Sequence, residues 1–171
     1  EKQRKIKFAV AQSYYDEGRF ITAIDKLTAV AYEFPSSDEA DAALQLVLDS
    51  YNTINDNDGL MLASRRFLDA ASPASDPLKG RIKQVLAAAE QRKLDEISLQ
   101  AAGEDGGDLT PLLSFAEQQK GTELGERALI NAFVAARAIG DTDQMYTLAD
   151  KLATEYPKSD QLPGIYTTLA Q

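Results

Sequence analysis

The sequence predicts an all-α fold, and three observations support this prediction. Apolar residues recur at the period of an α-helix along nearly the whole chain, and no stretch alternates convincingly as a β-strand does. Thr110-Pro111 is typical of a helix start, with a capping side chain before a proline at the first helical position. The segment 31–38 returns as 153–160, which indicates that a helical unit is repeated along the chain.

Glycine and proline residues mark where the individual helices begin and end. Gly18 and Gly140 interrupt the helical pattern, and the segment 103–108 (Gly-Glu-Asp-Gly-Gly-Asp) is a longer break. Asp76-Pro77 supplies a second helix start of the capping-residue-and-proline type. Together these signals predict helices at about 2–17, 20–34, 38–54, 58–71, 77–102, 110–120, 123–139, 142–156 and 160–170.

The two clearest copies of the repeated unit share their internal spacing. Pro35 lies 17 residues after Gly18, and Pro157 lies 17 residues after Gly140. A weaker copy lies between them, with its tyrosine 37 residues after that of the first unit. Each unit is therefore predicted to consist of a helix, a tight turn, a second helix and an exit of the form aromatic-Pro-x-Ser.

Each unit carries a stripe of residues that we expect to be buried, because helices that stack must hide one apolar face. Alanines alternate with large residues in these stripes, which lets neighbouring helices approach closely. In the first helices the stripes are Lys7, Val10, Ala11 and Tyr14; Leu44, Val47, Leu48 and Tyr51; and Leu129, Ala132, Phe133 and Ala136. In the second helices they are Phe20, Ile24, Leu27 and Val30; Leu60, Met61 and Phe67; and Met145, Tyr146, Ala149 and Leu152.

These residues resemble the pattern of the tetratricopeptide repeat (TPR) family. In the first unit the residues that match the recurring positions of the family are Tyr14, Gly18, Phe20, Ala23, Ile24, Leu27 and Pro35. The fourth unit departs from the pattern at Met145 and Ala136, and the second has Asn55 and Asn57 in place of the turn glycine and its aromatic residue. The third unit, about 77–120, keeps only the outline of a helix pair.

The resemblance implies a TPR-like α-solenoid of about four antiparallel helix pairs plus a C-terminal helix, in one domain spanning 1–171. The units would be 2–36, 37–75, 76–121 and 122–158, and the helix in 159–171 would be a short cap or a truncated unit. We expect the chain to be a fragment of a longer protein. The pitch and the exits resemble most the TPR proteins of the Gram-negative cell envelope, which implies a periplasmic or outer-membrane-associated location, with the cytoplasm as the alternative.

The composition excludes several functional classes. The chain has 18 Lys and Arg against 27 Asp and Glu, a net charge of −9, and no His, Cys or Trp. The acidic balance argues against nucleic-acid binding and against an electrostatic membrane anchor, and no apolar stretch reaches the length of a membrane span. With no imidazole, no thiol and no nucleotide-binding or nucleophile motif, the sequence predicts no catalytic residue and no cofactor.

Acidic clusters are the remaining candidates for metal binding or acid–base catalysis. The loop 104–108 and the segment 55–59 are rich in Asp, Glu and Asn, but their spacing fits no defined calcium-binding loop, so we interpret both as turns. The pairs in Asp38/Glu39/Asp41 and Asp95/Glu96 are interpreted as charges at helix starts and on polar faces. The sequence therefore predicts no metal site.

What remains is a surface for protein binding. The resemblance places the lining of a concave groove on the first helices, at Phe8, Gln12, Tyr15, Gln45, Asp49, Asn52, Ile130, Val134 and Arg137. Such a groove would bind a helix or an extended segment, and the net charge favours a basic or mixed-charge partner. The carboxylate clamp of chaperone-binding TPR domains is not expected, because Phe8 and Gln12 stand at its positions.

The resulting hypothesis is a non-enzymatic scaffold of a cell-envelope machine, serving outer-membrane assembly, envelope maintenance during division, or motility. Two alternatives stay open at this point. The chain is a structural spacer that assembles with copies of itself, or it is a helical domain that senses a small molecule in a pocket within 77–120. The oligomeric state is not predicted.

Overall fold

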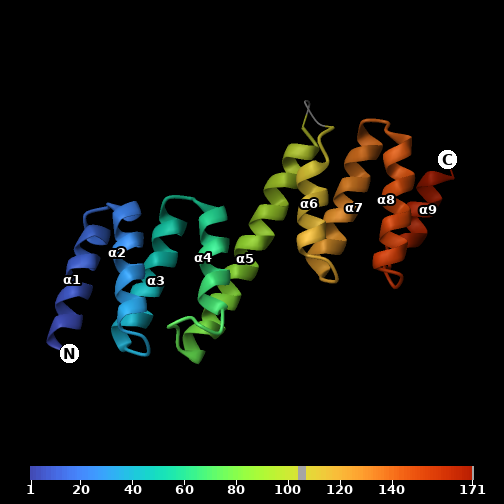
Figure 1. Cartoon of the computed structure of the whole chain (residues 1–171). Helices are drawn as coiled ribbons and strands as arrows, with labels where there is room; N and C mark the ends of the chain where they lie inside the picture. The colour runs from blue at the N-terminus through green and yellow to red at the C-terminus, as the bar shows by residue number, and fades with distance from the viewer. Residues whose placement is uncertain (104–106, 171) are drawn as a thin grey trace. The chain divides into compact units, whose positions relative to one another are not determined.

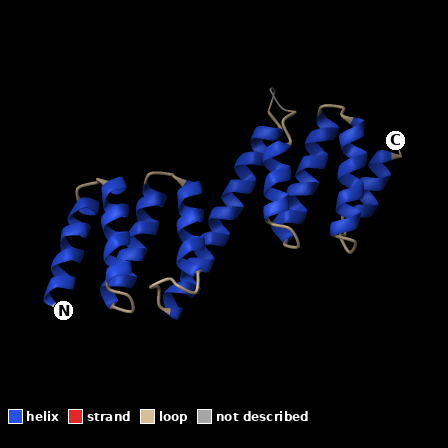
Figure 2. Ribbon diagram, viewed as in Figure 1, coloured by secondary structure: helices blue, strands red, loops and turns tan. Residues whose placement is uncertain are grey.

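The computed structural model describes residues 1–103 and 107–170, and this part of the chain contains nine α-helices and no β-strand (Figures 1 and 2). The all-α prediction is therefore confirmed. The largest difference at a helix end is at Leu68, where the fourth helix stops three residues before the predicted 71 because Asp69 is extended. The helices are α1 (Lys2–Asp16), α2 (Phe20–Glu33), α3 (Asp38–Thr53), α4 (Asn57–Leu68), α5 (Asp76–Ala101), α6 (Thr110–Gln118), α7 (Glu123–Ala138), α8 (Thr142–Glu155) and α9 (Leu162–Leu169).

The chain divides into two compact units, Glu1–Glu90 and Gln91–Gln171, and the division falls inside α5. Unit 1 holds α1 to α4 and the first part of α5, and unit 2 holds the rest. From α1 to α4 in unit 1 and from α6 to α9 in unit 2, helices that follow one another in the chain pack side by side (Figure 1). Each unit has its own apolar core, and we describe the two separately.

Three helical hairpins end their first helix in the same way. Gly18, Asn55 and Gly140 all have left-handed backbones, with φ of 73°, 57° and 73°. This conformation favours glycine and tolerates asparagine, which explains why Asn55 can replace the glycine. In each turn the next amide donates to a carbonyl five residues earlier: Arg19 to Tyr14 (2.8 Å), Asp56 to Tyr51 (3.0 Å) and Asp141 to Ala136 (3.0 Å). The hairpins α1/α2, α3/α4 and α7/α8 therefore share one register.

At the two helix starts that contain proline, the predicted capping residues do not stand at the cap position. α5 begins at Asp76, and the hydroxyl of Ser75 accepts from the backbone amide of Leu78 (3.3 Å). Before α6, the carboxylate of Asp108 accepts from the backbone amide of Thr110 (2.9 Å), and hydrogen bonds from Thr110 lower the pKa of Asp108. Asp76 and Thr110, which were predicted as caps, are the first residues of α5 and α6. In each helix the proline is therefore the second helical residue, not the first as predicted.

Most residues of the predicted stripes are buried in the two cores, which contain further residues that the stripes do not include. Buried large side chains include Leu27, Leu44, Leu60 and Phe67 in unit 1, and Leu112, Leu129, Leu148 and Leu152 in unit 2. Two residues of the stripes are exposed, and four more are half-buried: Lys7, Tyr14, Phe20 and Tyr51. Val10 is 52% exposed and lines an open depression between α1 and α2. Tyr146 is 55% exposed, and its hydroxyl donates to the carbonyl of Leu169 at the end of α9 (3.4 Å).

Lys7 is the one charged residue that the stripes contain. Its side chain is 41% exposed, and its ammonium pairs with Glu33 of α2 at 2.5 Å. The same ammonium lies 5.7 Å from the centre of the Phe34 ring. The apolar stem of the lysine thus packs between α1 and α2 while the charge stays in water.

Candidate functional site

In unit 1 the predicted groove residues lie on two helices that contact each other, α1 and α3. The hydroxyl of Tyr15 on α1 donates to the carboxylate of Asp49 on α3, and this hydrogen bond joins the two helices at the surface. We call the surface formed by the predicted groove residues of α1 and α3 the groove face. Its members are Phe8, Gln12, Tyr15, Gln45, Asp49 and Asn52.

Tyr15 is held in place from two sides. Its ring meets the ring of Phe20 edge to face, with the centroids 5.5 Å apart and the planes at 76°. The hydrogen bond to the Asp49 carboxylate raises the pKa of the Tyr15 hydroxyl, and partial burial and the charges of Asp49 and Asp16 raise it further. The hydroxyl therefore stays protonated and remains a hydrogen-bond donor at neutral pH.

The other residues of the groove face divide into half-buried and exposed side chains. Phe8 is half-buried and packs against the core of unit 1, so only part of its ring is available to a partner. Gln12 is half-buried, whereas Gln45, Asp49 and Asn52 are exposed. The amide of Gln45 donates to the backbone of its own helix. The groove face therefore offers mainly polar and acidic groups to solvent.

In unit 2 the predicted groove residues lie along α7. Val134 is 58% exposed, Arg137 is exposed, and Ile130 is half-buried against the core. Ile130 also borders an open depression of about 470 Å³, lined by Glu123, Glu126, Arg127, Asn131 and residues 158–161. Its charges are mixed, because acidic Glu123 and Glu126 stand beside Arg127.

The shared register of the hairpins shows that α3 and α7 present the same face with different chemistry. Counted back from the left-handed residues Asn55 and Gly140, Gln45 corresponds to Ile130, Asp49 to Val134, and Asn52 to Arg137. The face is polar and acidic on α3, and aliphatic and basic on α7.

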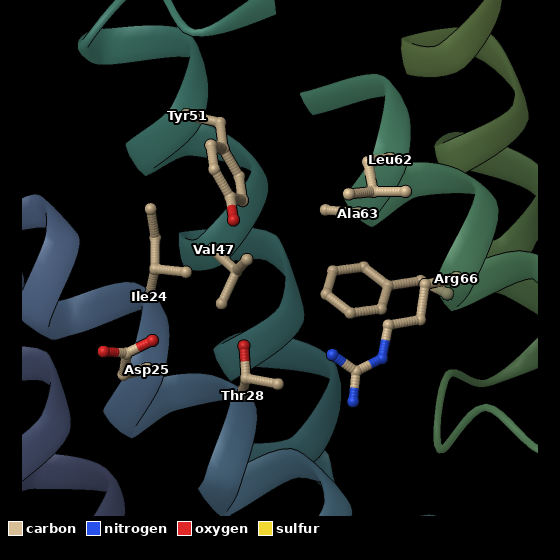
Figure 3. Close-up of a pocket in the computed structure, with 9 residues that line it drawn as sticks. Ile24, Asp25, Thr28, Val47, Tyr51, Leu62, Ala63 and Arg66 are labelled. Carbon is tan, nitrogen blue, oxygen red and sulfur yellow. The ribbon is translucent and has the colours of Figure 1, made fainter. Parts of the chain in front are cut away.

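Sequence reasoning missed a pocket between α2, α3 and α4 (Figure 3). Its volume is about 220 Å³, and its lining includes Ile24, Thr28, Val47, Tyr51, Ala63 and Arg66. In the register of unit 2, Thr28 and Ala63 correspond to Leu113 and Leu148. Two side chains smaller than leucine leave this space open, and that difference between units is the signal that could have revealed it.

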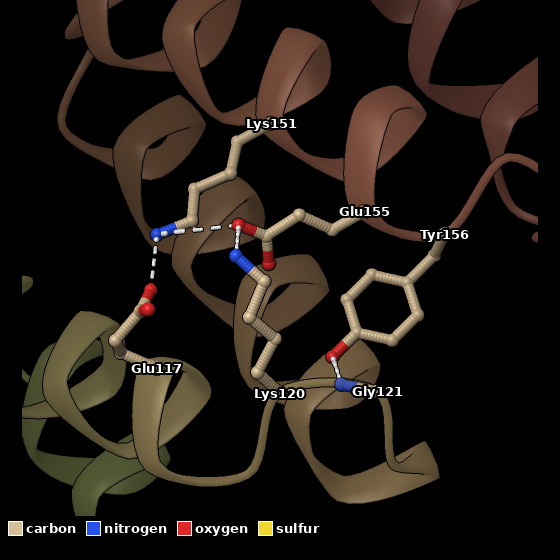
Figure 4. A network of polar contacts seen from close by, with 6 residues as sticks. All are labelled: Glu117, Lys120, Gly121, Lys151, Glu155 and Tyr156. Carbon is tan, nitrogen blue, oxygen red and sulfur yellow. Dashed lines mark hydrogen bonds and ion pairs between the residues drawn. The ribbon is translucent and has the colours of Figure 1, made fainter.

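We call the contact between α2 and α4 in unit 1, and the equivalent contact between α6 and α8 in unit 2, the seams. In unit 2, ion pairs join the two helices of the seam (Figure 4). Lys151 lies 3.2 Å from Glu117 and 3.9 Å from Glu155, and Lys120 lies 3.0 Å from Glu155. The hydrogen bond and charge of Glu155 raise the pKa of Lys120. The hydroxyl of Tyr156 accepts from the backbone amide of Gly121 (3.0 Å), which ties α8 to the turn that follows α6.

The acidic and asparagine-rich segments have structural roles where they are described. In segment 55–59, Asn55 makes the left-handed turn, the Asp56 carboxylate accepts from Gly59 (2.8 Å), and the Asn57 side chain donates to Ala89 (2.9 Å). Within residues 1–103 and 107–170 no cluster of three or more His, Cys, Asp or Glu side chains could hold a metal ion. Most of the acidic loop, residues 104–106, lies outside the described residues.

The remaining acidic candidates make contacts with neighbouring helices or turns. Glu39 pairs with Arg4 of α1 at 2.6 Å. Asp41 accepts hydrogen bonds from the backbone amide (3.0 Å) and the hydroxyl of Ser75, just before α5. Asp95 accepts from the side chain of Gln91 one helical turn earlier (2.7 Å). These contacts connect helices or support a helix surface.

No family model, curated protein or solved structure matches the chain. Across the described ranges, none of the helices combines the length and the apolar character needed to cross a membrane.

Proposed function

We propose that this chain is a non-enzymatic protein-binding scaffold of the TPR type, which binds partner segments on the groove face of unit 1 and on the matching face of α7 in unit 2. The observation that carries the proposal is the repeated register of the hairpins. It presents side chains at i, i+4 and i+7 on a face of α1, α3 and α7 that is half-buried on α1 and mostly exposed on α3 and α7, next to the buried stripe of each helix.

The chemistry of the groove face supports a basic or mixed-charge segment as the ligand. Asp49 and Asn52 are exposed acceptors on α3, and Tyr15 supplies an aromatic surface that its contacts hold in one orientation. Rigid aromatic side chains lose little conformational entropy on binding, so they serve well as anchors. On α7, Val134 offers an apolar contact and Arg137 a contact for an acidic or carbonyl group.

The resemblance to envelope TPR proteins supports a place for this scaffold in a Gram-negative cell-envelope machine. On this proposal the protein works in the periplasm or at the outer membrane, in outer-membrane assembly, envelope maintenance during division, or motility. The alternative proposals are a self-assembling spacer and a sensor of a small molecule.

Site-specific photo-crosslinking tests the groove. A photoreactive amino acid is placed at Gln45 or Val134, and, as the control, at Tyr166, which is 51% exposed on α9 outside the groove. We expect the two groove positions to give an adduct with the same partner, and the control position to give none. Tyr15→Ala and Arg137→Ala should each reduce the adduct while helicity measured by circular dichroism stays unchanged.

Two results would contradict this proposal. Equal adducts at the control position and at the groove positions would mean that the contact is not specific to the groove. Adducts only between copies of the chain, together with a mass in light scattering that rises with concentration, would favour the self-assembling spacer instead.

A further inference from the structure

The pocket between α2, α3 and α4 of unit 1 has apolar walls and a polar edge (Figure 3). Its buried walls are Ile24, Val47, Ala63 and Phe67. Thr28 and Tyr51 are half-buried and add hydroxyls to the lining, and the exposed residues of the edge are Asp25, Leu62 and Arg66. A mostly apolar lining with a few polar groups is the usual composition of a site for a small molecule.

The side chains at the equivalent positions of unit 2 differ in size and charge. Two leucines, described above, take the place of the small residues of the pocket. Asp25 corresponds, 85 positions later, to Thr110, which is uncharged. Arg66 corresponds to Lys151, whose ammonium pairs with Glu117. The combination of open space with two opposite charges at its edge is therefore specific to unit 1, and the shared backbone arrangement does not require it.

The two charged side chains at the edge, Asp25 on α2 and Arg66 on α4, do not pair with each other. In the part of the chain that the structure describes, the carboxylate of Asp25 makes no ion pair or hydrogen bond. Figure 3 shows the two on opposite sides of Thr28, with the hydroxyl of Tyr51 pointing into the space from α3. Both charges act on that hydroxyl: burial is the first cause of the raised pKa of Tyr51, the charges of Asp56 and Asp25 raise the pKa further, and the charge of Arg66 lowers it. The space between the two charges is thus open to a ligand that carries both a cation and an anion.

The guanidinium of Arg66 is held in position without losing its hydrogen-bond donors. It lies over the ring of Tyr32, 4.8 Å from the ring centre. Stacking uses the flat face of the guanidinium, so the N–H groups at its edge can still bind a carboxylate at two points. The hydroxyls of Thr28 and Tyr51 make no hydrogen bond within the described residues, so they too can bind a ligand.

We propose that this pocket binds a free α-amino acid with an apolar side chain, such as leucine. The ammonium of the ligand donates to the carboxylate of Asp25, and its carboxylate accepts from the guanidinium of Arg66. Its side chain lies against the buried walls, where it is removed from water. The pocket volume of about 220 Å³ suits such a ligand, because a cavity of about 150 Å³ holds benzene and drug-sized ligands need about 300 Å³ or more. This site goes beyond the proposed scaffold function, and it shares no residue with the groove face.

Isothermal titration calorimetry of the whole chain with four ligands tests the chemistry of the site. L-Leucine carries the ammonium, the carboxylate and the apolar side chain. Isocaproate lacks the ammonium, leucinamide lacks the carboxylate, and L-serine lacks the apolar side chain. We expect leucine to bind and each of the other three to bind at least about tenfold more weakly, because each leaves one part of the site without a partner.

Charge variants assign the groups of the ligand to the two residues at the edge. Asp25→Asn should weaken the binding of leucine but should not weaken that of isocaproate, which has no ammonium. Arg66→Met should weaken the binding of leucine but should not weaken that of leucinamide, which has no carboxylate. Both residues are exposed, so circular dichroism should show the same helicity in the two variants.

Filling the pocket separates binding from folding. Ala63→Leu and Thr28→Leu each introduce the leucine that unit 2 carries at the equivalent position. We expect either substitution to abolish the binding of leucine while the melting temperature stays the same or rises, because the new side chain occupies existing space. Ala29→Leu adds the same bulk at an exposed position of α2 outside the pocket, and it should leave the affinity unchanged.

Three results would overturn the proposal. The first is no binding of leucine to the unmodified chain. The second is binding of leucine that neither Ala63→Leu nor Thr28→Leu changes in a folded variant, since the ligand would then lie elsewhere. The third is equal binding of leucine, isocaproate and leucinamide, which would mean that the pocket takes an apolar group without recognising an amino acid.

Discussion

The helices α2–α4 of unit 1 and α6–α8 of unit 2 share the same turns and helix caps, but the side chains at their seams differ. The turns before α3 and α7 contain left-handed residues, Ser36 with φ of 60° and Gly121 with φ of 78°. The helices that follow are capped alike: the hydroxyl of Ser37 accepts from Ala40, and that of Thr122 from Gly125. Ser37 and Thr122 are 85 residues apart (37 to 122), the same interval that separates Asn55 from Gly140.

The seams differ because of side chains at equivalent positions. In unit 1, Arg66 of α4 lies over the ring of Tyr32 of α2, 4.8 Å from its centre. The equivalent residues 85 positions later, Lys151 and Glu117, form an ion pair. One backbone arrangement therefore accommodates a cation–π contact beside an open pocket in unit 1, and an ion-pair network in unit 2. The residues that the two units share at their turns and caps determine the backbone arrangement. The side chains at the contact between two helices determine whether a pocket remains there.

The most demanding test of this comparison is Leu148→Ala, which gives unit 2 the alanine that unit 1 has at Ala63. Leu148 is 2% exposed, so its truncation leaves a cavity in the core of unit 2. We expect the free energy of unfolding to fall by about 2–5 kcal/mol. Urea denaturation followed by circular dichroism measures the loss, with the exposed neighbour Thr147→Ala as the control. A loss no larger than that of the control would mean that Leu148 does not fill the seam.

Ala23→Leu tests whether one hairpin tolerates the side chain of another. Ala23 is 0% exposed in α2, whereas Leu60 and Met145 occupy the equivalent places in α4 and α8. Because the space around Ala23 is already filled, we expect overpacking to cost about 1–3 kcal/mol. Thermal unfolding measures this cost. An unchanged melting temperature would show that the small residue is not required and that the hairpins are interchangeable at this position.

The two seams should also differ in their response to salt. Lys151→Met removes an ion pair, whereas Arg66→Met removes a cation–π contact with Tyr32. Both pairs are near the surface, so we expect each substitution to lower the free energy of unfolding by less than about 1 kcal/mol. The effect of Lys151→Met should shrink as salt screens the ion pairs.

Denaturation of both variants at low and high ionic strength separates the two contributions. The same salt dependence in the two variants would contradict the distinction between the seams.

Local signals in the sequence predicted the helices well. Gly18 and Gly140 place the hairpin turns because few other residues adopt a left-handed backbone, and Asn55 is one of those few. The apolar period then identifies stripe residues such as Leu44 and Leu129, which are buried. These features depend only on residues close together in the chain, so a single sequence carries them.

Features that depend on what packs against a residue could not be predicted in the same way. Val10 has the sequence environment of a core residue but is exposed, because periodicity identifies an apolar face without identifying what covers it. The pocket at Thr28 and Ala63 arises from side chains on different helices, and only an alignment of the two seams exposes it. In the candidate site, five of the nine positions chosen from the spacing are exposed, and Phe8, Gln12, Tyr15 and Ile130 are half-buried. The Tyr15–Asp49 hydrogen bond could not be predicted, because it depends on α1 and α3 lying side by side.

The smallest predicted effect concerns that hydrogen bond and is specific to unit 1, because Val134 stands at the position of Asp49 in unit 2. The Asp49 carboxylate raises the pKa of Tyr15 in the folded protein by accepting its hydrogen bond. A group with a raised pKa contributes stability below its unfolded pKa, and that contribution is lost as the pH rises through the folded pKa. Asp49→Ala should therefore lower the pKa of Tyr15 and remove this part of the alkaline pH dependence of stability.

Tyr51 provides the internal control for this titration, because burial is the first cause of its raised pKa and nearby charges from Asp56 and Asp25 follow. NMR of labelled tyrosine rings follows each hydroxyl separately, and we expect Asp49→Ala to shift Tyr15 while Tyr51 stays as it was. If both tyrosines shift together, the substitution has loosened unit 1 as a whole. If neither shifts, the hydrogen bond between α1 and α3 does not form in solution, and the groove face loses the contact that orients Tyr15.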